Sequence, residues 1–102
     1  MVVTKQEEII KEIILAARKI QDFLWGEPNK NWGLEEWKRM FRKRIVKIDD
    51  IDPANPHAVI ELKKRLLQNA ALSVALLIRL DNGLPGKENV DVVPSNLPEY
   101  AD

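Results

Sequence analysis

Cysteine is absent from the 102 residues, and histidine occurs once, as His57. The sequence therefore excludes disulfides, thiol catalysis, Cys-ligated zinc and a His-rich metal site. No apolar run approaches the length of a membrane span, and residues 1–19 contain the acids and polar interruptions that a signal peptide lacks. We expect a cytoplasmic protein without a membrane partner.

An excess of charge of either sign is also missing, because 16 basic residues balance 16 acidic ones. This balance argues against a general polyanion binder, although it leaves room for a local basic patch. With 45% hydrophobic and 31% charged residues, the composition suits a soluble helical domain better than a disordered chain. The length suits one small domain.

Two helices are predicted in the first half of the chain. Thr4 and Glu7 form a T-x-x-E capping box, and the apolar residues that follow predict a helix from Lys5 to about Trp25. The stretch "GEPNKNWG" (26–33) is rich in glycine, proline and asparagine, which is typical of a loop. A second helix is predicted over residues 34–48.

A third helix is predicted over residues 56–81, with Asn55 as its N-cap and Gly83 as its C-cap. Its second half, "NAALSVALLIRL", is apolar on nearly all sides, which is typical of a helix buried on several sides. The fold class is therefore all-α, with one helical domain over residues 1–82 and an extended or partly disordered tail over residues 83–102. Three such helices often leave a core unfinished, so we expect a homodimer or higher homo-oligomer to complete the bundle.

The second helix is unusually basic for a chain without net charge. Its cations are Lys38, Arg39, Arg42, Lys43, Arg44 and Lys47. They either form a solvated face, favoured near a helix C-terminus by the helix dipole, or bind the phosphates of a nucleic acid. Trp37 and Phe41 lie on the opposite, apolar stripe, where we expect core residues rather than base-stacking platforms. Nucleic acid is therefore the less favoured partner.

Three tryptophans, Trp25, Trp32 and Trp37, cluster around the predicted loop. They either close the end of the bundle or form the walls of a nucleobase-sized pocket, since indole stacks well on a base. Polar residues of the same loop would add contacts to such a pocket: Glu27, Asn29 and Asn31.

The other candidates have simple structural explanations. Asp49, Asp50 and Asp52 lack the spacing of an EF-hand loop, and an aspartate before a proline is a common turn signature. We expect a helix end and a turn there. His57 stands alone, and we expect a surface histidine. No catalytic Ser-His-Asp set, P-loop or Gly-rich dinucleotide motif is present.

The order of three segments resembles a known family. They are "IQDFLWGEPNKNW", "WKRMFRKRIVKI" and "ELKKRLLQNAALSVALLIRLD". Together they are similar to the short, all-α MazG-like nucleoside triphosphate pyrophosphohydrolases, many of which carry Trp-Gly-Glu or Trp-Gly-Gln after the first helix. The resemblance covers about Ile20 to Asp81 and implies a MazG-like helical bundle.

In that family, two pairs of acids three residues apart hold magnesium, which grips the triphosphate and helps to activate water. The resemblance places Arg44 and Lys47 at the first pair, and Arg65 and Gln68 at the second. Every metal-binding carboxylate is then absent and three of the four positions are cations, which cannot ligate magnesium. The resemblance thus implies that metal-dependent hydrolysis is lost. Arginine and lysine can instead hold a phosphate directly. The candidate ligand contacts also include two aromatic residues, Trp25 and Trp32.

Several functions remain open at this point. The preferred one is a catalytically degenerate binding or interaction protein that holds a nucleotide or phosphate without a cofactor. An active pyrophosphohydrolase would need magnesium and other acids. Asp49 and Asp52 have the right spacing, but Glu61 is the sole acid between Asp52 and Asp81 that could belong to a second pair. Further alternatives are a nucleic-acid-binding helical protein and a structural network in which Glu61 or Glu12 neutralises the cations.

Overall fold

Three helices make up the computed structural model, which describes residues 4–85 apart from the side chains of Glu27 and Pro28. They are α1 (Lys5–Asn29), α2 (Leu34–Asp49) and α3 (Ala58–Asn82). The described residues contain no strand, which confirms the all-α class. Apart from its first three residues, the predicted tail (83–102) lies outside the described part of the chain.

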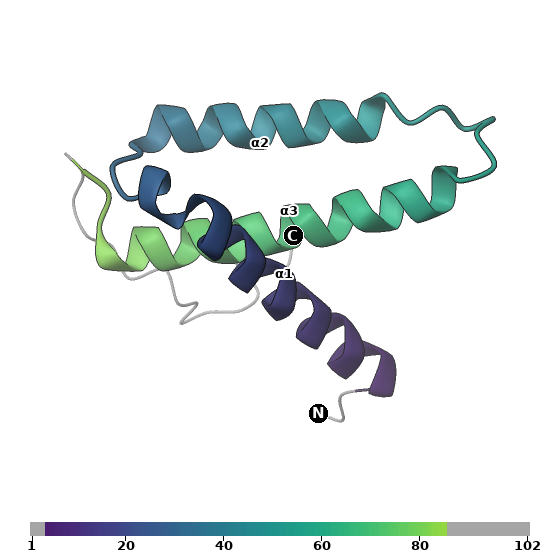
Figure 1. Cartoon of the computed structure of the whole chain (residues 1–102), viewed down its shortest axis with the longest axis horizontal. Helices are drawn as coiled ribbons and strands as arrows, with labels where there is room; N and C mark the ends of the chain where they lie inside the picture. The colour runs from purple at the N-terminus through teal and green to yellow at the C-terminus, as the bar shows by residue number, and fades with distance from the viewer. Residues whose placement is uncertain (1–3, 86–102) are drawn as a thin grey trace, which may run out of the picture.

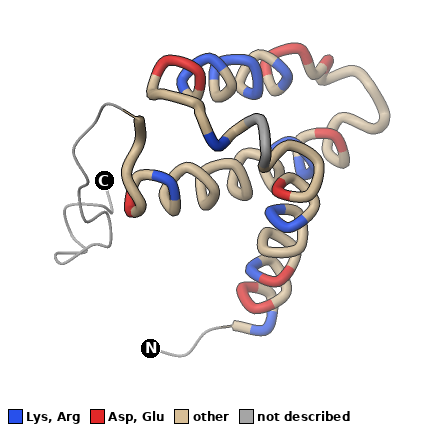
Figure 2. The backbone as a smooth tube through the Cα atoms, turned by 60° about the vertical axis from the view of Figure 1, so that its left-hand side comes forward, with Lys and Arg blue, Asp and Glu red and all other residues tan. Residues whose placement is uncertain are grey.

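Helix α3 packs against both α1 and α2. Helix α2 runs antiparallel beside α3, and α1 crosses the C-terminal half of α3 (Figure 1). The N-terminal half of α1 extends away from the other two helices in both views (Figures 1 and 2). A concave region therefore forms where the C-terminal half of α1 faces both other helices.

Local capping explains several of the helix boundaries. The backbone N–H of Glu7 donates to Thr4 Oγ1 at 3.2 Å, so α1 begins at Lys5 as predicted. The backbone N–H of Gly33 donates to Glu36 Oε2 at 3.1 Å at the start of α2. Gly83 ends α3 with a φ of 92°, a conformation that favours glycine.

Two predicted boundaries were wrong. Helix α1 continues through the first half of the predicted loop, to Asn29. Residue propensity is a weak guide to where a helix ends, and here it failed at Gly26 and Pro28. Helix α3 begins at Ala58 rather than at residue 56. The Asn55 side chain is used in a preceding turn, where its Oδ1 accepts the backbone N–H of His57 at 2.9 Å.

A small core lies where α2 and the C-terminal half of α3 meet. Trp37 is 1% exposed and packs with Leu72 and Leu84. Partly buried residues surround this cluster: Trp32, Met40, Phe41, Ala75, Leu76 and Leu80. The prediction that Trp37 and Phe41 face the core rather than solvent is confirmed. Many large apolar side chains of α1 and α3 nevertheless stay exposed.

Replacing Trp37 with alanine should lower the free energy of unfolding by about 3–5 kcal/mol, because it removes the largest buried side chain and leaves a cavity. Val59, which is 81% exposed on α3, provides the control. Val59→Ala should change stability by no more than about 0.5 kcal/mol. Urea denaturation followed by circular dichroism measures both changes. Equal effects of the two substitutions would contradict the placement of the core.

Candidate functional site

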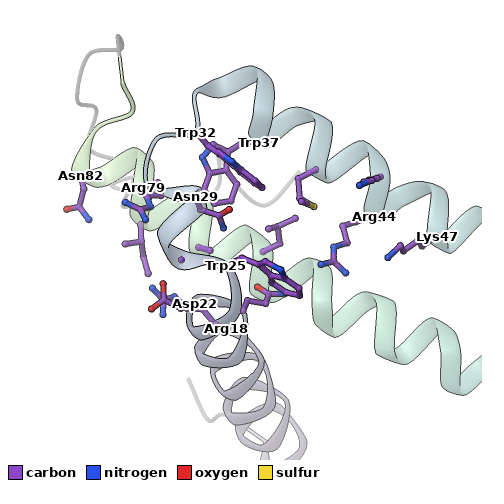
Figure 3. A pocket seen from close by; sticks show the side chains of 17 residues that line it. Arg18, Asp22, Trp25, Asn29, Trp32, Trp37, Arg44, Lys47, Arg79 and Asn82 are labelled. Carbon is purple, nitrogen blue, oxygen red and sulfur yellow. The ribbon is translucent and has the colours of Figure 1, made fainter.

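A cavity of about 380 Å³ lies between the three helices. This volume falls within the range of small-molecule sites, about 300–1,000 Å³. Trp25, Trp32 and Trp37 all contribute to its wall (Figure 3). The rings of Trp32 and Trp37 pack edge to face with centroids 5.1 Å apart. Trp37 thus belongs to the core and also lines the cavity.

Positive charge dominates the lining of this cavity. Among the described side chains that line it, the basic residues are Arg18, Lys43, Arg44, Lys47 and Arg79, and the one acid is Asp22. They come from all three helices and surround the same space (Figure 3). No ion pair reaches Arg44 or Lys47 within residues 4–85. A ligand with several negative charges therefore suits the cavity electrostatically.

Four of the predicted site residues line this cavity directly: Trp25, Trp32, Arg44 and Lys47. Gln68 and Arg65 lie beside it and connect to it through hydrogen bonds. Arg44 Nη1 donates to Gln68 Oε1 at 3.3 Å, and Arg65 Nη1 donates to the same oxygen at 3.1 Å. The antiparallel packing of α2 on α3 thus brings together the residues that the resemblance had placed in one site.

Gln68 also receives a bond from the third helix of the site. Gln21 Nε2 on α1 donates to the backbone carbonyl oxygen of Gln68 at 3.2 Å. One residue of α3 is therefore tied to both α1 and α2. This arrangement fixes the Arg44 guanidinium relative to the cavity wall.

Like charges lie close together at this point, and the pKa values of Arg44 and Lys47 are lowered. Burial, and secondarily the Arg65 charge, lowers the pKa of Arg44. The neighbouring Arg44 guanidinium is the main cause that lowers the pKa of Lys47, with smaller contributions from desolvation, Arg65, Lys43 and Lys64. A bound anion would relieve this repulsion.

Within residues 4–85, Arg65 is the one member of this group that has an acidic neighbour at ion-pair distance. Arg65 Nη2 lies 3.8 Å from Glu61 Oε2. Glu61 and Arg65 line a second cavity of about 360 Å³ together with Lys47. The predicted structural ion-pair network therefore exists for Arg65, and within residues 4–85 it does not extend to Arg44 or Lys47.

Unpartnered polar atoms are concentrated in residues that line the first cavity. Arg18 Nε and Trp37 Nε1 are donors, and Gln21 Oε1 and Asn29 Oδ1 are acceptors. All four atoms are buried and have no hydrogen-bond partner among the described residues. A buried polar group without a partner costs about 1–3 kcal/mol, so these atoms oppose the stability of this part of the fold.

The six cations of α2 divide into two sets. Lys43, Arg44 and Lys47 line the cavity, whereas Lys38, Arg39 and Arg42 are exposed and do not. Lys38 Nζ pairs with Glu35 Oε1 at 3.3 Å across one helical turn. Figure 2 shows this basic band with acids at either end of α2. The solvated-face interpretation therefore suits Lys38, Arg39 and Arg42, while the other three cations line the cavity.

Sequence reasoning named Trp25 and Asn29 on the face of α1 that lines the cavity, and it missed Arg18 and Asp22. Arg18, Asp22, Trp25 and Asn29 share this face because they are spaced four, three and four residues apart. This spacing could have revealed them, but assigning residues 26–33 to a loop broke the pattern. The α3 wall was also missed. Its residues are Leu72, Ala75, Ile78, Arg79 and Asn82.

The remaining candidates behave as structural residues. Asp52 Oδ1 accepts the backbone N–H of Ala54 at 2.9 Å, which is the expected turn. His57 is exposed, as expected. Within residues 4–85, no three His, Asp or Glu side chains are grouped closely enough to hold a metal ion. In the same range, every helix is too short or too polar to cross a membrane.

Comparisons with known protein families, with curated proteins and with solved structures found no match.

Replacing Lys47 with glutamine should raise the melting temperature of the ligand-free protein, because it removes a charge that Arg44 repels. The lowered pKa means that folding disfavours protonated Lys47. The wild type should therefore gain stability as pH rises through the lowered pKa of Lys47 toward the ordinary value of 10.5. Over the same range, the difference in melting temperature between the wild type and Lys47→Gln should shrink. Thermal melts between pH 7 and that value, at low salt, measure this effect.

Lys38→Gln provides the control, since Lys38 is paired with Glu35 on the outer face of α2. This substitution should leave the melting temperature unchanged or lower it slightly. High salt should reduce the gain from Lys47→Gln, because the Debye length falls to about 3 Å at 1 M. A Lys47→Gln protein that is less stable than the wild type at low salt would contradict the repulsion.

Proposed function

We propose that this protein binds a nucleotide, or another ligand with several phosphate charges, without a metal ion and without turnover. The observation that carries this proposal is the cavity that combines five basic side chains and one acid with three tryptophans. The phosphates would lie at Arg44, Lys43 and Lys47. There they would supply negative charge to Arg44 and Lys47, neither of which forms an ion pair within residues 4–85.

The opposite wall favours a ligand that also has a flat, polar head. Trp25 is 47% exposed and offers an accessible ring face, and Trp32 lies on the other side of the cavity (Figure 3). Three polar residues, Arg18, Gln21 and Asn29, line the same cavity. A nucleobase combines an aromatic face with donors and acceptors on its edge, so a nucleotide satisfies both halves of the cavity.

The proposal also includes the MazG-like ancestry of the fold. Its support is the juxtaposition of Arg44, Arg65 and Gln68 through an antiparallel pair of helices, as the resemblance requires. In this interpretation the cations replace the metal-binding acids, and the site keeps phosphate recognition but loses the hydrolytic step. The protein would act in the cytoplasm as a binding module, with a second copy as its partner.

Nucleotide binding should therefore persist in EDTA. We expect a nucleoside triphosphate to raise the melting temperature equally with magnesium and with chelator, and no pyrophosphate to be released. A stabilisation that needs magnesium, together with pyrophosphate release, would instead establish the enzyme alternative. Calorimetric titration and a pyrophosphate assay on the same samples distinguish the two.

Arg44→Gln should weaken this binding about tenfold or more, because a hydrogen bond to a charged group contributes about 1.5–3 kcal/mol. Arg42→Gln is the matched control, since Arg42 lies two residues away on α2 and does not line the cavity. It should leave the affinity unchanged within about twofold at moderate salt. Equal losses in both variants would point to a diffuse basic surface and would favour nucleic acid as the ligand.

Trp25→Ala separates recognition of the base from recognition of the phosphates. Loss of one stacking surface should weaken nucleotide binding by about 1–3 kcal/mol, while binding of inorganic tripolyphosphate should be unaffected. The exposure of Trp25 makes this substitution mild for the fold, which a melting curve verifies. Equal weakening of both ligands would contradict a base-binding role for this residue.

A further inference from the structure

Helix α1 carries an apolar stripe that faces neither α3 nor the cavity. It consists of Ile9, Ile13, Ala16, Ile20 and Phe23, whose spacing alternates between four and three residues. All five are exposed, and Ile20 and Phe23 are 61% and 88% exposed. This spacing is that of the a and d positions of a coiled coil, in which two helices bury such a stripe against each other.

The stripe is distinct from the other two faces of α1. Arg18, Asp22 and Trp25 face the cavity, and Gln21 bonds to α3. At about 100° per residue, the centre of the stripe lies roughly half a turn around the helix from the cavity-lining residues. A partner helix on this stripe would therefore leave the ligand site open.

Charges beside the stripe favour one orientation of a partner helix. Glu12 and Lys19 lie seven residues apart along one edge of the stripe, and within residues 4–85 neither forms an ion pair. In an antiparallel pair of identical helices, Glu12 of each copy comes beside Lys19 of the other. The same contact then occurs twice, which a two-fold symmetric interface requires.

We propose that α1 pairs antiparallel with α1 of a second copy of this chain and so forms a homodimer. Ile20 of one copy packs against Ile9 of the other, and Ile13 packs against Ala16. The two Glu12–Lys19 pairs between the copies lie beside these layers, one pair toward each end of the contact. This inference does not rest on the proposed ligand, because the two sites lie on opposite sides of α1.

The substitution Ile20→Asp tests the stripe by placing a charge within the apolar contact. We expect the wild-type full chain to sediment as a dimer, and Ile20→Asp to raise the dissociation constant at least about tenfold. Ile60→Asp is the matched control, because Ile60 is 66% exposed on α3 and Ile20 is 61% exposed. The control should keep the dimer, and both variants should keep nucleotide binding if the ligand proposal also holds.

Charge reversal tests the orientation. Glu12→Lys and Lys19→Glu should each weaken self-association about tenfold, because two attractive pairs become repulsive. An equal mixture of these two variants should form a heterodimer, since every facing pair then has opposite charges. The double variant Glu12→Lys, Lys19→Glu should regain the wild-type affinity.

Three results would overturn this proposal. The first is a full-length wild-type chain that stays monomeric. If a chain ending at Pro85 dimerises in that case, residues 86–102 occupy the stripe instead of a second copy. The second is a dimer that Ile60→Asp disrupts and Ile20→Asp does not. The third is a mixture of the two charge variants that fails to associate.

Discussion

Packing of α2 along α3 makes two guanidinium groups share a single acceptor. Arg44 and Arg65 both donate to Gln68 Oε1, and Lys47 lies close enough for Arg44 to lower its pKa. Repulsion of this kind opposes folding, so the apolar contacts between the helices must hold the cations together. An anion in the adjacent cavity would offset the repulsion, which links the stability of this part of the fold to its ligand.

The same constraint explains how the basic residues of α2 are arranged. Lys38 has an acidic neighbour on its own helix, whereas Arg44 has an amide as its acceptor. A cation on the outer face is solvated and needs no partner. A half-buried guanidinium beside another one is different, since desolvation and repulsion act in the same direction. The position of each cation, rather than their number, therefore indicates which of them act on a ligand.

The sequence was sufficient for the parts of the structure that depend on local patterns. The capping residues Thr4 and Gly83 marked helix ends correctly, and helical spacing placed Trp37 in the core. The meeting of Arg44 with Arg65 was predicted through a family resemblance. Part of the α1 wall was missed, because the residue preferences of 26–33 predict a loop whereas α1 continues to Asn29. The helical spacing that joins Arg18 and Asp22 to Trp25 and Asn29 was therefore interrupted.

A single copy of the chain leaves much apolar surface uncovered. Its fully buried side chains are few, and large residues such as Ile20, Phe23 and Ile60 face solvent. Exposed apolar patches of this kind mark interaction surfaces in folded proteins. The heptad spacing and flanking charges of α1 favour that helix as the site of self-association. The ligand cavity lies on the other side of α1, so binding and assembly can be separated by mutation.

The pKa of the Lys47 amine, followed by NMR with EDTA present, tests the central claim most directly. We predict a Lys47 pKa below the ordinary value of 10.5 in the free protein and a marked rise when inorganic tripolyphosphate is added. An anion beside the cluster favours the protonated amine, which causes the rise. A Lys47 pKa that tripolyphosphate leaves unchanged, while the protein is otherwise folded, would contradict a metal-free phosphate site at this position.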